Sequence, residues 1–438
     1  MAIIPQQTLF VWSDIENLGD LERLRLVLEY MPDEELMQKL EKERGKGRDD
    51  FPVRAMWNSV LAGLVFEHKS IESLRRELSR NGQLRFMCGF KSNKDVPEAY
   101  VYSRFFKKLY KKEEMINDIF NKLVDELEEL LPGFGTNLAI DGKAIPSLPP
   151  RENKNKKEDG RRDLDANWGK KEYKGKKEDG TAWSKVVKWF GYKLHLIVDS
   201  DYELPVAFEV TKASSSEVKQ AHTMIDDLKK THPELIEKSE ILTADRGYDD
   251  IKLHKKLWNE NDIKPVIDIR NMWKDKDETR LLMGYENVVH NYKGNVYCVC
   301  METGIQREMC VGGFESDRKE QGTLKKLCPA KQYGIECKYM DKCQVKQGIR
   351  IDISQDQRVF CPIDRASYKW DRQYKNRTAV ERVNSRLDVS FGFENHYIRG
   401  IKKMKIKCGI ALCVMLAMAL GRTKENQADK MRSLVGSV

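Results

Sequence analysis

The chain has 438 residues, of which 34% are charged and 40% apolar, and its formal net charge is +9. This length allows two or three domains with a core of normal size, and the apolar content excludes general disorder. The positive charge is concentrated, because residues 151–188 hold 13 Lys and Arg against 8 Asp and Glu, and residues 364–407 hold 12 against 5. Such clusters are typical of nucleic-acid-binding proteins, although a solvated basic surface explains them equally well.

Neither end of the chain predicts a membrane segment. Met1–Phe10 lacks the basic start and apolar centre of a signal peptide. The longest apolar run, Cys408–Leu420, is shorter than the ~18 residues that span a bilayer, so we expect a buried core helix. We therefore expect a cytoplasmic, nucleoid-associated protein without a membrane partner.

Residues 1–134 predict an all-helical domain. Apolar residues recur at helical spacing in several segments, including a helix over Ser70–Ser79 and a long amphipathic helix over Glu113–Leu131. The basic outer faces of these helices suit DNA contact or dimerisation, and they suit an ordinary helical bundle equally well.

Residues 135–270 predict a mixed α/β layer. Asn137–Ile145 is a short apolar run that reads as a buried strand with Asp141 at its middle. Residues 146–185 are rich in Lys, Glu, Asp and Gly and predict a mobile loop, in which Trp168, Tyr173 and Trp183 either stack on unpaired bases or dock back on the domain. Ser214–Ser216 are plausible caps of the helix that follows Glu217. The further strands are predicted over 187–198, 204–211, 240–244 and 263–269, with helices over 218–233 and 251–258.

Residues 271–361 predict a Cys-rich insertion, followed by a second part of the α/β layer over 362–425 and a tail over 426–438. Seven of the ten cysteines lie between Cys298 and Cys361. Without a secretory signal, metal ligation or burial is expected rather than a disulfide framework. One interpretation is a zinc site formed by Cys328, Cys337, Cys343 and Cys361, with Cys298, Cys300 or Cys310 as substitutes. Buried free thiols are the alternative, because the spacings are longer than those of most zinc sites.

Three carboxylates stand in unusual settings. Asp141 and Asp245 each follow or interrupt a predicted strand, and Glu381 lies on the polar face of a helix predicted over Thr378–Leu387. Carboxylates that converge in this way suit two hard divalent cations such as Mg²⁺. The ordinary alternatives are local ion pairs, in which Glu381 pairs with Arg377 at the i, i+4 spacing and Arg246 neutralises Asp245.

Three blocks of sequence resemble bacterial insertion-sequence transposases of the DDE class. Ile140-Asp141-Gly142-Lys143 is similar to the first acidic motif of that family, and Thr243–Asp249, which contains Ala-Asp-Arg-Gly-Tyr, is similar to the second. Tyr374, Arg377 and Glu381 have the spacing of the third. The family signature continues with a lysine seven residues after the glutamate, where this chain has Asp388, and Arg382 and Arg386 are nearby candidates to replace that lysine. The segment Lys188–Asp199 and the helical stretch Pro52–Phe90 are also similar to the family.

The resemblance implies an RNase H-like mixed sheet flanked by helices, with Asp141, Asp245 and Glu381 as ligands of two Mg²⁺ or Mn²⁺ ions. It implies cleavage of the phosphodiester at the ends of an element and transfer of the freed 3′-OH to target DNA. The N-terminal helices would recognise the terminal inverted repeats and help to form a dimer on the DNA. A nuclease that cuts without joining, or an inactive DNA-binding derivative, are the alternatives.

The same resemblance implies a set of DNA contacts. Tyr374 and Arg377 would hold a terminal phosphate, since the planar fork of arginine meets phosphate oxygens bidentately. Arg382, Arg246 and Lys143 are the further expected contacts.

Overall fold

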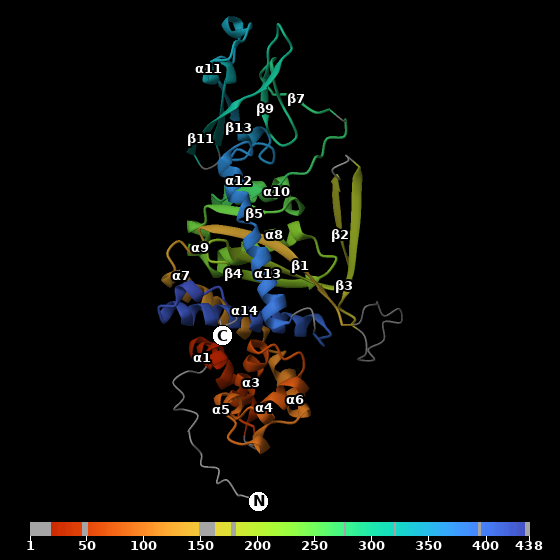
Figure 1. Ribbon diagram of the computed structural model, residues 1–438, viewed down its shortest axis with the longest axis vertical. Helices are drawn as coiled ribbons and strands as arrows, with labels where there is room; N and C mark the ends of the chain where they lie inside the picture. The colour runs from red at the N-terminus through yellow and green to blue at the C-terminus, as the bar shows by residue number, and fades with distance from the viewer. Residues whose placement is uncertain are drawn as a thin grey trace, which may run out of the picture.

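The computed structural model describes residues 19–45, 51–148, 163–176, 181–275, 277–318, 321–392 and 396–433. Three parts follow one another along the long axis of the molecule (Figure 1). The N-terminal helices lie at one end, a layered α/β part occupies the middle, and a small lobe of short strands lies at the other end.

The N-terminal part is helical, as predicted. Ser70 begins one helix by accepting the backbone N–H of Ser73 at 3.1 Å, and Asn81 begins the next by accepting that of Leu84 at 3.0 Å. Gly89, with φ of +100°, ends that helix in the left-handed conformation that glycine adopts without strain. The helices are α1 (Glu22–Tyr30), α2 (Glu34–Arg44), α3 (Val53–Val65), α4 (Ile71–Arg80), α5 (Gly82–Cys88), α6 (Ala99–Leu109) and α7 (Glu113–Leu130).

The middle part contains a mixed six-stranded sheet of order β2-β3-β1-β5-β6, with β4 also paired to β3. The pairs β1–β3, β2–β3 and β3–β4 are antiparallel, whereas β1–β5 and β5–β6 are parallel. The strands are β1 (Asn137–Pro146), β2 (Asn167–Lys176), β3 (Ala182–Asp199), β4 (Leu204–Lys212), β5 (Ile241–Ala244) and β6 (Lys264–Ile267). The predicted mixed α/β layer is therefore present.

The prediction of a loop over 146–185 is wrong for much of that range. Strand β2 and the first half of β3 form a long antiparallel hairpin, paired from Asn167 with Gly191 to Lys176 with Ala182. Residues 183–188 are all exposed, so the hairpin buries no continuous apolar face there and its sequence lacks the alternation that predicts a strand. At its base Trp168 packs on Phe190, with ring centroids 5.6 Å apart. Figure 1 shows the hairpin standing away from the sheet.

Helices cover both faces of the sheet. The side chain of Lys143 meets Asp388 of α13, while the neighbouring Gly142 faces Glu217 of α8. Because successive residues of a strand face opposite sides, α13 and α8 lie on opposite faces of β1. The helices of this part are α8 (Glu217–Thr231), α9 (Pro233–Lys238), α10 (Ile251–Lys255), α12 (Tyr368–Lys375), α13 (Thr378–Phe391) and α14 (Ile401–Lys424).

Helix α14 contains the predicted core helix. It is long and apolar enough to cross a membrane, but 89% of its most apolar window is buried inside the protein. It packs against α1, α7 and β4, and it lies between the N-terminal helices and the sheet (Figure 1). One continuous hydrophobic core therefore joins the N-terminal helices to the sheet.

The end lobe falls in the stretch predicted as an insertion, between β6 and α12. It contains two small antiparallel sheets and has a hydrophobic cluster of its own, which includes Val288, Val296, Leu324 and Ile351. Its elements are β7 (Arg280–Leu281), β8 (Val288–His290), β9 (Val296–Val299), β10 (Gln306–Glu308), β11 (Cys310–Arg318), β12 (Gln321–Leu327), α11 (Pro329–Tyr333) and β13 (Ile349–Asp352).

Candidate active site

Asp141 and Asp245 lie side by side on the neighbouring strands β1 and β5, where the parallel pairing of these strands ends. The parallel pairing of β1 with β5 ends at Ile140 and Ala244, so each aspartate directly follows the last residue of this parallel pairing, while β1 continues its antiparallel pairing with β3 through Asp141 to Pro146. Neighbouring strands are ~4.8 Å apart, which brings the two carboxylates close together. Asp245 also begins a short 3₁₀ turn, Arg246–Tyr248, by accepting the N–H of Gly247 at 2.7 Å.

The Asp141 carboxyl group lies in a poorly solvated, negatively charged setting. It is only 9% exposed, and it accepts a hydrogen bond from the N–H of Gly142 at 2.7 Å. Burial raises its pKa to about 6, and the charges of Asp245 and Glu217 act in the same direction against the opposing charge of Lys171. A carboxylate in this setting is stabilised by a bound cation.

Tyr248 lies close enough to Asp141, Glu217 and Asp245 to be affected by their charges. Its side chain is completely buried, and its hydroxyl has no hydrogen-bond partner among the described residues. Burial raises its pKa, as do the charges of Asp141, Glu217 and Asp245. An orphaned buried hydroxyl beside three carboxylates indicates a polar site that accommodates a ligand or its water.

Glu217 is the residue of this site that the sequence analysis missed. It occupies the first turn of α8, and its carboxylate pairs with Lys193 at 2.9 Å. A Cβ atom built on Gly142 would lie 3.2 Å from Glu217 Oε1, and one built on Gly247 would lie 3.0 Å from Glu217 Oε2. The carboxylate of Glu217 therefore fits between Gly142, which follows Asp141, and Gly247, which precedes Tyr248.

Glu381 does not join Asp141 and Asp245 in this structure. It lies in the first turn of α13 with its side chain 52% exposed, and it pairs with Arg377 Nη1 at 2.7 Å. This is the local ion pair that the sequence analysis gave as the alternative. Burial lowers the pKa of Arg377, but Glu381, Tyr374 and Asp141 outweigh this effect and raise it. Arg377 is therefore within electrostatic range of both Glu381 and Asp141.

The other predicted DNA contacts are engaged in contacts within the chain. Arg246 pairs with Asp268 at 2.6 Å, so it does not neutralise Asp245 as the alternative suggested. Tyr374 stacks on Trp370, with ring centroids 4.7 Å apart. Arg382 pairs with Glu203 at 2.6 Å, and Arg386 binds the same carboxylate.

Asp388, which stands where the family signature has a lysine, forms an ion pair with Lys143 of β1. Both side chains are largely buried. A positive charge is therefore supplied next to this position by the strand that carries Asp141, whereas the candidates Arg382 and Arg386 are held by Glu203. The acidic residue at this position is thus paired with a lysine across the contact between α13 and β1.

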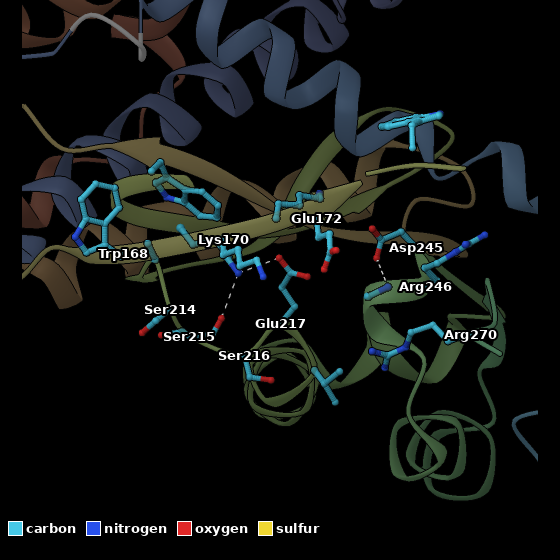
Figure 2. A pocket seen from close by; sticks show the side chains of 17 residues that line it. Trp168, Lys170, Glu172, Ser214, Ser215, Ser216, Glu217, Asp245, Arg246 and Arg270 are labelled. Carbon is cyan, nitrogen blue, oxygen red and sulfur yellow. Dashed lines mark hydrogen bonds and ion pairs between the residues drawn. The ribbon is translucent and has the colours of Figure 1, made fainter. Parts of the chain in front are cut away.

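A cavity of about 1180 Å³ lies between the β2–β3 hairpin and the N-terminal end of α8. Figure 2 shows Asp245, Glu217 and Arg246 at one side of it and Trp168 at the other. Cationic and aromatic side chains from both walls line it, namely Lys170, Lys171, Lys193, Arg246, Arg270, Trp168, Trp183 and Trp189.

Five cysteines of the end lobe surround a second, much smaller cavity of about 20 Å³: Cys298, Cys300, Cys328, Cys337 and Cys343. Burial raises the pKa of Cys298 to about 11, and Cys328, Cys343 and Cys337 contribute to the increase. Cys361, the fourth member of the predicted set, is buried elsewhere, near Arg365 and Asp364. Three of the four predicted ligands thus share one cavity, with Cys298 and Cys300 in addition.

The only group of three candidate ligand atoms within 4.8 Å of one another, among the described residues, lies between α7 and the residue that precedes α9. It comprises Asp125, Glu128 and His232. His232 Nδ1 lies 2.7 Å from Asp125, its Nε2 lies 3.2 Å from the amide oxygen of Asn121, and Glu128 pairs with Lys238 at 2.6 Å. These internal partners account for the cluster as a link between the two helices.

Comparisons with known proteins identify the family. A model described as a transposase DDE domain matches residues 132–417, and one described as a transposase domain (DUF772) matches residues 12–108. No curated protein matches the chain. Among solved structures, the piggyBac transposase in a synaptic complex with hairpin DNA matches at a TM-score of 0.41 and 11% identity, over 96% of this chain and 80% of that chain. The first family model spans well over half of the chain, and the chain therefore belongs to the family of transposases with a DDE domain.

Proposed function

We propose that this DNA transposase cleaves phosphodiester bonds at the ends of its element and joins those ends to target DNA, with Asp141, Asp245 and Glu381 as the acidic residues of the reaction. The observation that carries the proposal is the placement of Asp141 and Asp245 directly after the last residues of the parallel pairing between β1 and β5. The RNase H-like arrangement is part of the proposal, and the mixed sheet with helices on both faces supports it.

The residues fit divalent cations. Asp141 and Asp245 offer hard oxygen ligands, and the raised pKa of Asp141 shows that the opposing charge of Lys171 does not offset the burial of this carboxyl group. The chemistry that a pair of Mg²⁺ or Mn²⁺ ions supplies at such a site is charge stabilisation of the attacking and leaving oxygens of a phosphodiester. Metal identity and number remain part of the proposal.

Glu381 reaches this site by exchanging partners. It lies in the first turn of α13, and its half-exposed side chain forms an ion pair with Arg377. A rotation away from Arg377 turns Glu381 toward the aspartates and frees the guanidinium for a phosphate oxygen. Tyr374, next to Arg377, then contributes to the same phosphate contact.

The DNA backbone is proposed to enter the large cavity beside Asp245. Its cationic lining matches a phosphate backbone, and its three tryptophans offer stacking surfaces for bases. Arg246, with its side chain 66% exposed, is the most accessible of the predicted contacts. Recognition of terminal inverted repeats by the N-terminal helices, a dimer on DNA and action in the cytoplasm at the nucleoid complete the proposal.

The test is a cleavage and strand-transfer assay on DNA carrying the repeats that flank the gene. Asp245→Ala is expected to abolish cleavage in Mg²⁺ while DNA binding persists, because only the carboxylate is removed. Retained cleavage would contradict the assignment of the site. Cleavage without joining would indicate the nuclease alternative, and binding without cleavage by the unmodified chain would indicate the inactive derivative.

We also propose a structural zinc ion in the end lobe, held by four of the five cysteines around the small cavity. Residues 331–344 contain no buried side chain, so this segment has no hydrophobic core of its own. A bound metal ion would hold it in place. The purified chain is expected to hold one zinc ion, to keep it in Cys361→Ser and to lose it in Cys337→Ser. Elemental analysis that finds no zinc would contradict this assignment.

A further inference from the structure

Resting on the proposed metal site, we infer that Glu217 is a fourth acidic residue of that site and contributes its carboxylate to the cation held by Asp141 and Asp245. Glu381 belongs to α13, whereas Glu217 approaches from α8 on the opposite face of β1. The cation would thus be reached from both faces of the sheet.

Glu217 packs closely on the backbone that carries the two aspartates. The neighbour of Asp141 is Gly142 and the second residue after Asp245 is Gly247, and a side chain at either position would press on a carboxylate oxygen of Glu217. A Cβ on Gly247 would at the same time lie 2.7 Å from Asp245 Oδ1. Glu217 and Asp245 therefore contact the same small volume, and Figure 2 shows both pointing into the cavity.

The buried hydroxyl of Tyr248 has no hydrogen-bond partner among the described residues. This fully buried side chain lies within range of the charges of Asp141, Glu217 and Asp245, yet its hydroxyl donates to none of them and to no other described residue. A buried donor is rarely left unpaired. A cation shared by the three carboxylates, with its coordinated water, provides the missing partner.

Glu217 forms an ion pair with Lys193 in this structure. The Lys193 side chain is only 9% exposed, and its ammonium group also donates to the carbonyl of Ser215 at 3.2 Å. Lys193 therefore neutralises Glu217 when the cation is absent. Cation binding would compete with this pair, so Lys193 should weaken metal binding and Glu217 should strengthen it.

The experiment measures Mn²⁺ affinity of the full chain by isothermal titration calorimetry, without DNA. Glu217→Gln keeps the shape of the side chain and is expected to weaken Mn²⁺ binding by about tenfold or more. Glu237→Gln, which removes an exposed carboxylate of α9, is the matched control and should bind as the unmodified chain does. Lys193→Met, which removes the competing charge, should bind Mn²⁺ more tightly.

Unchanged affinity in Glu217→Gln, with binding lost in Asp245→Asn, would overturn the role of Glu217 and leave the proposed function intact. Unchanged affinity in Asp245→Asn would instead overturn the metal site itself. If Glu217→Gln does not fold, the test uses Lys193→Met. A Mn²⁺ affinity of Lys193→Met that is equal to or weaker than that of the unmodified chain contradicts the inference.

Discussion

Replacing Asp141 by asparagine should stabilise the metal-free protein while abolishing catalysis. The carboxyl group has a pKa of about 6 in the folded chain, because burial raises it from its ordinary value of 3.8. Between these two pH values the folded chain binds more protons than the unfolded chain, so stability falls as the pH rises. Above about pH 6 the penalty is complete and amounts to about 3 kcal/mol. Asparagine carries no charge at any pH and avoids this penalty.

The assay compares melting temperatures in EDTA at pH 4 and pH 8. At pH 8 the Asp141→Asn variant should melt higher than the unmodified chain, on the order of 3–6 °C for a chain of this size. At pH 4 the two should be nearly equal. In Mg²⁺ at pH 8 the difference in melting temperature should shrink or change sign, because only the unmodified chain is stabilised by the bound ion.

Asp199 provides the control for this experiment. Burial also raises its pKa to about 6, but it accepts backbone N–H groups from Gly135, Asp201 and Tyr202 at 2.6–2.9 Å and lies outside the proposed site. Asp199→Asn should therefore keep the Mg²⁺ response. An Asp141→Asn variant that melts lower than the unmodified chain in EDTA at pH 8, or whose advantage is the same at pH 4, would refute the reasoning.

Three further predictions concern the same region. Mg²⁺ should raise the melting temperature of the unmodified chain but not that of Asp245→Asn, as measured by differential scanning fluorimetry. Lys143→Ala should lower the free energy of unfolding by roughly 1–3 kcal/mol, because it leaves the partly buried Asp388 without its partner, and the double variant Lys143→Asp with Asp388→Lys should recover much of that loss in denaturant titrations. Gly247→Ala should slow Mg²⁺-dependent cleavage while far-UV circular dichroism stays unchanged, because the added methyl group presses on Asp245 and Glu217; full activity would show that the carboxylates tolerate displacement.

The strands that carry the aspartates are the part of the site that the sequence predicts best. Asn137–Ile145 and Glu240–Ala244 are short apolar runs, and the structure has strands at both places. Their pairing puts Asp141 and Asp245 at one edge, which local pattern alone does not specify. The position of Glu381 depends on a side-chain rotation, and the sequence carries no information on which partner it takes in the absence of metal and DNA.

Glu217 had a weaker but readable signal. The helix that joins β4 to β5 runs antiparallel to β5, so its first turn lies beside the end of the strand where Asp245 follows. The prediction of serine caps accounts for this turn locally, and Ser216 does accept the N–H of Lys219, at 3.4 Å. The β2–β3 hairpin had no such signal, because its exposed lysines hide the strand period that a half-buried strand displays.

The position of α14 late in the chain has a consequence for the synthesis of the protein. Nearly every residue from Met404 to Arg422 is buried, and it contacts both α1 near the start of the chain and β4 of the sheet. Chains emerge from the ribosome with the N-terminal residues first. The apolar faces of α1, α7 and β4 must therefore wait until Ile401–Lys424 has been translated before α14 covers them, and a nascent chain truncated before Ile401 would expose all three and aggregate.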